Sequence, residues 1–308
     1  MTFTTRDLTP RIATEIRATK EELLSGEYAG RIRELLEQRG VLVFPQINFN
    51  DEEQVAFTNT LGTVAPEHDG EIIYKVTLDN KVNPKADYLK GSWYWHIDGT
   101  MNKVPILASI LSAKVLSPTG GDTDFCNTYA AYDDLSDEDK QAFEGLKVMH
   151  SAWNTLFYYD PEPDPRLLRG MMAIGDQELP LVWKHRSGRK SLVIGATARH
   201  VVDMDYKKSI ELLVRLRARL REPDQALQPR RRAGAPRRTT PAPARASAYF
   251  CWMKRSSSSV STRHWPRPPI WIAISSLRRT SAYAWDHDTL RISATSSRVR
   301  KRGVGIGN

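Results

Sequence analysis

Apolar residues recur along the first part of this chain at helical and strand spacings, which predict a series of short elements. Ile32, Leu35 and Leu36 share one face of a helix predicted over 28–39. The apolar run 41–44 that follows is of strand type. At 308 residues the chain could form one large domain or two small ones, with enough apolar residues for a core in either case.

The same reasoning extends the series as far as about residue 220. Helices are predicted at 50–60, 136–144 and 205–220, because polar capping residues precede their apolar faces. Strands are predicted at 71–78, 106–115 and 146–151, with a hairpin formed by 180–184 and 191–194. Many short strands with flanking helices predict a mainly β fold with helical cover.

The stretch 93–100 carries the candidate chemistry. Its aromatic and β-branched residues suit a strand, and Gly99 supplies a turn. On a strand, His96 and Asp98 would project to the same face. An imidazole and a carboxylate side by side are two of the three ligands in a 2-His-1-carboxylate iron(II) site. A polar pair on a half-exposed strand is the alternative interpretation.

Charge divides the chain into two regions. Residues 1–220 hold 27 Lys and Arg against 32 Asp and Glu, whereas residues 221–308 hold 18 against 4. The second region also has 12 Ser and 8 Pro and no helical or strand period. We therefore predict a domain over 1–220 and a basic, disordered or poorly packed tail over 221–308.

Composition indicates the cellular location of the protein and limits its possible partners. Two cysteines are too few for a disulfide framework, and no stretch approaches the length of a membrane span or forms an apolar signal region. A cytoplasmic protein without membrane association is expected, and homo-oligomerisation is left open. The basic tail lacks interleaved stacking aromatics, so a specific nucleic-acid partner is not expected.

Further motifs follow the stretch 93–100 in a fixed order. A long apolar strand leads to a Pro/Gly turn and to Gly120-Gly121-Asp122-Thr123. With Gly40-Val41-Leu42-Val43-Phe44 upstream and Ala130-Ala131-Tyr132 downstream, this order resembles the taurine dioxygenase and 2,4-dichlorophenoxyacetate dioxygenase family of iron(II)/2-oxoglutarate-dependent oxygenases. The resemblance covers roughly residues 5–220 and implies a double-stranded β-helix, a relative of the jelly roll.

The resemblance also implies roles for individual residues. His96 and Asp98 would bind Fe(II), and the Thr123 hydroxyl would help to hold a carboxylate of the co-substrate 2-oxoglutarate. His68 loosely matches a region that contacts the acidic group of the substrate, although a surface loop histidine is the alternative. Ser92 stands where the family has a taurine-contacting asparagine, so taurine itself is not expected. The implied reaction is hydroxylation of a small organic acid by O₂, with release of succinate and CO₂.

The family's remaining signature is missing from this sequence. Its second histidine ligand follows the aspartate by about 150 residues, which is near residue 246, where the chain reads Ala244-Arg245-Ala246-Ser247. His264 and His287 lack the family's surroundings, and no arginine stands in the motif that binds 2-oxoglutarate. The C-terminal part of the core is therefore expected to be incomplete.

A frameshift between about Leu216 and Arg230 is one explanation. The family often has Asp-Asn-Thr-Gly-Thr before its distal histidine, and GC-rich codons for these residues, entered one base late, encode Thr-Thr-Pro-Ala-Pro. The chain has this string at 239–243. Three functional hypotheses thus remain: an active dioxygenase, an inactive relative without the third ligand and the arginine, and a nonspecific nucleic-acid binder that uses the basic tail.

Overall fold

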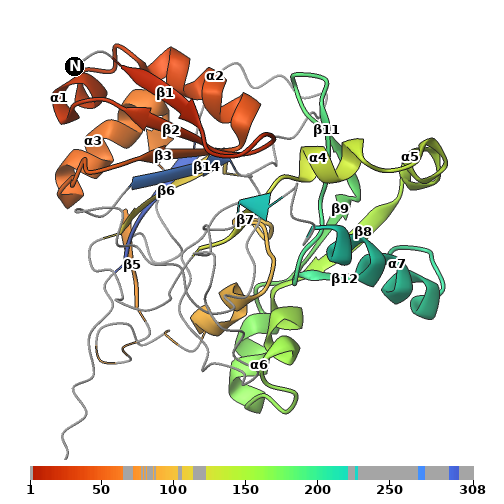
Figure 1. Cartoon of the computed structure of the whole chain (residues 1–308). Coiled ribbons are helices and arrows are strands. Elements are labelled where there is room, and N and C mark those ends of the chain that lie inside the picture. The colour runs from red at the N-terminus through yellow and green to blue at the C-terminus, as the bar shows by residue number, and fades with distance from the viewer. Residues whose placement is uncertain are drawn as a thin grey trace, which may run out of the picture.

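The largest sheet forms one half of the molecule (Figure 1). The computed structural model of the chain describes residues 3–64, 72–77, 79, 81, 86, 88–102, 106–113, 123–220, 226–227, 270–274 and 291–297. Among these, eight strands are ordered β1-β2-β3-β14-β6-β15-β4, and β5 also pairs with β15. Their bounds are Thr4–Asp7 (β1), Thr14–Arg17 (β2), Val41–Phe44 (β3), Thr63–Val64 (β4), Ile73–Val76 (β5), Ala108–Ala113 (β6), Ile270–Ile274 (β14) and Arg291–Ser297 (β15).

Three helices cover one face of this sheet, as Figure 1 shows. They are α1 (Lys20–Leu24), α2 (Ala29–Arg39) and α3 (Asp51–Leu61). As the spacing predicts, Ile32, Leu35 and Leu36 of α2 are buried, and they pack in one apolar cluster with Leu42 and Phe44 of β3. The predicted cap of α3 is also confirmed, since Asn50 and Glu53 form a reciprocal capping box.

The other half is built on an antiparallel sheet in the order β12-β8-β9. Its strands and the neighbouring short strands are β7 (Phe125–Cys126), β8 (Lys147–Ser151), β9 (Asp176–Pro180), β10 (Val182–Lys184), β11 (Lys190–Leu192), β12 (Ala198–Val201) and β13 (Ala226–Leu227). The helices of this half are α4 (Thr128–Asp133), α5 (Asp137–Phe143), α6 (Pro165–Met172), α7 (Tyr206–Arg219) and the 3₁₀ segments η1 (Tyr88–Trp93) and η2 (Ala152–Tyr158).

The fold class needs one correction. Helices take about as much of the described chain as strands, so the molecule is mixed α/β rather than mainly β. The stretch 93–100 is also not a strand, because Trp93 ends a 3₁₀ helix and residues 98–101 form a turn. The other predicted elements are confirmed within a few residues wherever the chain is described. None of the described helices is long and apolar enough to span a bilayer.

Two strands of the main sheet come from the chain after residue 220. The apolar strand β14 pairs antiparallel with both β3 and β6, and β15 pairs parallel with β6. The sequence of β14, Ile270-Trp271-Ile272-Ala273-Ile274, is a short apolar run of strand type. The division into residues 1–220 and 221–308 stays a prediction.

A buried polar cluster joins helix α4 to the β10–β11 hairpin. The hydroxyl of Tyr129 is hydrogen-bonded to Nδ1 of His185 (3.0 Å), and Nε2 of His185 to Oγ of Ser191 (2.7 Å). The guanidinium of Arg189 lies 3.8 Å from the Tyr129 ring centroid and donates to the carbonyl of Glu37. The hairpin is thereby fastened to both α4 and α2. Burial, and then the charge of Arg189, lower the pKa of His185 from 6.5 to about 4.

This histidine makes folding stability depend on pH. In the unfolded chain His185 binds a proton below about pH 6.5, whereas in the folded chain it does so only below about pH 4. Its contribution is therefore complete above pH 6.5 and is lost as the pH falls towards 4, by about 3 kcal/mol. We expect His185→Gln to remove that share of the decline in unfolding free energy, measured by urea denaturation at pH 7 and pH 4.

Tyr129→Phe serves as the matched control for this prediction. It deletes the hydrogen bond to His185 but leaves the ring buried, and burial is the larger cause of the lowered pKa. The control should therefore keep the steep decline with acid. An equally steep decline in His185→Gln would contradict the prediction and assign the pH dependence to other groups, such as His150, whose pKa burial also lowers to about 4.

Candidate metal centre

The residues of the candidate centre lie between the 3₁₀ helix η1, which ends at Trp93, and the turn 98–101, which begins at Asp98. Trp95 and Ile97 are buried at 5% and 3% exposure in the core of the β8–β9–β12 half. His96 and Asp98 are less buried, with 11% and 18% of their side chains exposed, and the two side chains approach each other, as predicted, although no strand forms.

The two polar groups face each other directly. Nε2 of His96 lies 3.2 Å from Oδ1 of Asp98, and Nδ1 lies 2.7 Å from the carbonyl oxygen of Tyr94. A carbonyl only accepts hydrogen bonds, so Nδ1 carries the proton and donates it. With the proton on Nδ1, the lone pair of Nε2 faces the carboxylate of Asp98. Such a contact is favourable only with a proton or a cation between the two atoms.

This donor pair fits a divalent metal ion. Two ligands at about 2.1 Å from a metal, on adjacent octahedral positions, lie about 3.0 Å apart, close to the 3.2 Å between Nε2 and Oδ1. The hydrogen bond from the other ring nitrogen to a backbone carbonyl is the usual support of a metal-binding histidine. Within the described ranges, no cluster of three or more His, Cys, Asp or Glu could hold a metal.

The turn after Asp98 requires glycine. Gly99 has φ +69°, and a Cβ on it would lie 2.9 Å from Cγ1 of Ile106. The amide of Asn102 donates to the carbonyl of Gly99 (2.9 Å), and the hydroxyl of Thr100 donates to that of Ile97 (2.5 Å). These two bonds close the turn directly behind the carboxylate ligand.

A distant segment supports the histidine. The amide of Ala196 donates to the carbonyl of Trp95 (2.7 Å), and the side chain of Asn154 donates to the carbonyl of Ala196 (2.7 Å). Gly195 is so close to the same backbone that an added Cβ would lie 3.0 Å from Cα of His96. The sequence analysis missed Gly195 and Asn154, since no pattern in the sequence signals a contact between residues so far apart.

Thr123 and the remaining histidines lie in different parts of the chain, some of them outside the described residues. Thr123 is partly buried two residues before β7, whose Cys126 packs in the same core cluster as Trp95 and Ile97. His68 lies outside the described residues, as do the tail histidines 264 and 287. His150 and His185 are buried in other contacts. The structure thus brings His96 and Asp98 together, with Thr123 on a neighbouring segment.

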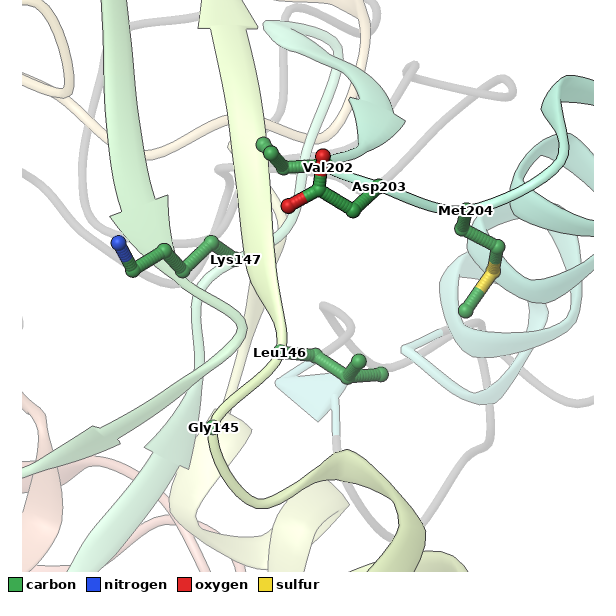
Figure 2. Close-up of a pocket in the computed structure, with 6 residues that line it drawn as sticks. All are labelled: Gly145, Leu146, Lys147, Val202, Asp203 and Met204. Carbon is green, nitrogen blue, oxygen red and sulfur yellow. The ribbon is translucent and has the colours of Figure 1, made fainter.

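A surface hollow of about 390 Å³ lies apart from this centre (Figure 2). It is lined by Gly145, Leu146, Lys147, Val202, Asp203 and Met204. Lys147 begins β8, and the end of β8 near the centre is Ser151, which is about 13 Å away along the strand. Figure 2 shows Lys147 extending away from Met204, so the hollow gathers no convergent set of polar groups.

Characterised enzymes resemble this chain over most of its described part. The chain is 32% identical over 216 residues to the alpha-ketoglutarate-dependent 2,4-dichlorophenoxyacetate dioxygenase of Cupriavidus pinatubonensis, which is 63% of this chain and 74% of that enzyme. It is 32% identical over 187 residues to the (S)-phenoxypropionate/alpha-ketoglutarate-dioxygenase of Sphingobium herbicidovorans, covering 57% of this chain and 64% of that enzyme. An alpha-ketoglutarate-dependent sulfate ester dioxygenase of Pseudomonas putida is 27% identical over 237 residues, 73% of this chain and 76% of that enzyme.

Solved structures agree on the fold. AAD-2 in complex with Mn(II) and N-oxalylglycine superposes with a TM-score of 0.64 at 22% identity, over 91% of this chain and 92% of that chain. A taurine dioxygenase from Burkholderia xenovorans gives a TM-score of 0.58 at 20% identity, over 88% and 90%. This chain therefore has the fold of these dioxygenases, the double-stranded β-helix.

A family model settles the relationship suggested by the motifs. The model described as "Taurine catabolism dioxygenase TauD, TfdA family" matches residues 4–235, about three quarters of the chain. This range contains His96, Asp98 and Thr123. The chain therefore belongs to the taurine catabolism dioxygenase TauD, TfdA family of alpha-ketoglutarate-dependent dioxygenases, as its motifs predict.

Proposed function

We propose that this chain binds Fe(II) through His96 and Asp98 and uses 2-oxoglutarate and O₂ to hydroxylate a small organic acid. The single observation that carries the proposal is the 3.2 Å approach of Nε2 of His96 to Oδ1 of Asp98. The side chains that alternate with them, Trp95 and Ile97, are buried. The family membership supports the reaction class.

The residues of the chain have distinct tasks in this reaction. The Tyr94 carbonyl holds the proton on Nδ1 of His96, so the lone pair of Nε2 stays directed at the metal. Trp95 and Ile97 anchor the segment in the core and exclude water from one side of it. The hydroxyl of Thr123 donates to a carboxylate of 2-oxoglutarate. Bound Fe(II) supplies the redox chemistry by which O₂ converts 2-oxoglutarate to succinate and CO₂ and a substrate C–H to C–OH.

The substrate class follows from the relatives and from one departure in this chain. The relatives are named for aryloxyalkanoates and a sulfate ester, and each of these compounds carries an acidic group. We assign His68 to that acidic group. Ser92 replaces the family's taurine-contacting asparagine, and its hydroxyl donates within the chain to the carbonyl of Leu89. Taurine is therefore a poor fit.

One observation favours a second candidate, a relative that folds but does not turn over. No third metal ligand joins His96 and Asp98 within the described segments. Two protein ligands without the third bind Fe(II) weakly. The two candidates differ in a direct assay, because only an active enzyme releases succinate from 2-oxoglutarate when Fe(II) is added.

Removing the imidazole tests the metal centre itself. We expect His96→Ala to abolish measurable Fe(II) uptake and succinate release, because only the Asp98 carboxylate remains of the proposed pair. The measurement is metal titration of the purified chain, followed by succinate detection. His200→Ala is the control, since His200 lies on β12 beside Arg199 and should leave uptake unchanged. Equal uptake by the native chain and His96→Ala would refute the assignment.

The proposed role of Thr123 is tested by measuring the KM for 2-oxoglutarate. We expect Thr123→Ala to raise the KM for 2-oxoglutarate by about tenfold, the cost of one hydrogen bond to a charged group. Thr123→Ser keeps the hydroxyl and should stay near the native value. Succinate release measured over a range of 2-oxoglutarate concentrations gives both numbers. The same KM in the alanine variant would remove Thr123 from the co-substrate site.

The substrate assignment is tested by measuring whether a candidate substrate stimulates the conversion of 2-oxoglutarate to succinate. We expect a phenoxyalkanoate or an alkyl sulfate to stimulate succinate release above the rate without substrate, and taurine to have no such effect. Oxygen consumption with each compound in turn provides the measurement. Stimulation by taurine alone would reverse the assignment made from Ser92.

A further inference from the structure

The backbone of His96 lies against a segment that has no metal-binding residue of its own. The amide of Ala196 donates to the carbonyl of Trp95 (2.7 Å). This bond joins the segment 195–197 to the residue before His96. At Gly195, an added Cβ would lie 3.0 Å from Cα of His96 and 3.0 Å from the carbonyl oxygen of Trp95. Non-bonded heavy atoms normally stay about 3.5–4.0 Å apart. An added Cβ would therefore force this backbone to move by a few tenths of an ångström.

The far side of this segment is anchored to β8 and η2. The amide of Ser151 donates to the carbonyl of Thr197 (2.9 Å), and Nδ1 of His150 lies 2.9 Å from Oγ1 of Thr197. The side chain of Asn154 donates to the carbonyl of Ala196 (2.7 Å). These bonds hold residues 195–197 in place, so the segment acts as a fixed surface for the His96 backbone.

We propose that Gly195 and Asn154 are positioning residues that set the place of His96 relative to Asp98. Gly195 lets residues 195–197 contact the backbone of His96. The hydrogen bond from Asn154 to Ala196 holds those residues in that position. The hydrogen bond from Nδ1 to Tyr94 ties the imidazole to its own local backbone. A displacement of residues 95–96 therefore moves Nε2 as well. Metal sites tolerate only about 0.5 Å of such displacement. This proposal rests on the metal centre assigned above.

Gly195→Ala is the decisive variant, and the chain offers a matched control. Gly30 lies in α2, and an added Cβ there would meet no atom within 4 Å. Each purified full-length variant is titrated with Co(II), whose visible d–d absorption reports the geometry of its ligands, and its thermal unfolding is recorded alongside. We expect Gly195→Ala to weaken Co(II) binding about 10- to 100-fold and to shift the d–d bands. Gly30→Ala should match the native chain in both.

Asn154→Ala provides an independent reading if Gly195→Ala fails to fold. It removes the bond to Ala196 without adding volume, and we expect a folded protein with weaker Co(II) binding and altered d–d bands. Native affinity and bands in either folded variant would overturn the proposal. Loss of folding in both would overturn it as well, because the contact would then hold the fold rather than the ligand.

The same titration separates this proposal from the metal centre on which it rests. Equal Co(II) binding by the native chain and His96→Ala removes the centre itself. If the native chain binds Co(II), His96→Ala does not, and Gly195→Ala binds as the native chain does, then the centre stands and only the positioning role falls.

Discussion

The candidate centre depends on holding two electron-rich atoms, Nε2 of His96 and Oδ1 of Asp98, at 3.2 Å from each other. Two lone pairs repel unless a proton or a cation lies between them. The segment that carries these atoms is anchored by the burial of Trp95 and Ile97, at roughly 2–3 kcal/mol for each large apolar side chain. A bound cation turns the same geometry from a cost into a favourable contact.

The segment that carries the proposed ligands packs on the half of the molecule that is built on the β12-β8-β9 sheet. Trp95 and Ile97 belong to the core formed by β8, β9, β11, β12 and α7, not to the core under α1, α2 and α3. The buried cluster of Tyr129, His185 and Ser191 fastens the hairpin of the same half to α4. The candidate site therefore belongs to this half of the molecule.

Local patterns predicted much of this, and long-range contacts explain what they missed. The pairing of His96 with Asp98 was predicted from a strand that does not form. The two side chains nevertheless meet, at the point where the segment after η1 enters the turn 98–101. Gly99 was predicted as a turn from its residue type alone. Gly195 and Asn154 could not be found in this way, because their role exists only once residues 95–96 and 195–196 meet.

The backbone beside the proposed ligand His96 is held by Ala196 and Asn154, which both lie within the range matched by the family model. No third protein ligand joins His96 and Asp98 in the described part of the chain. The proposed pair would leave positions on a bound metal open for the co-substrate 2-oxoglutarate. Metal and co-substrate should accordingly bind with strong mutual dependence, and Thr123 would affect iron affinity without touching the iron.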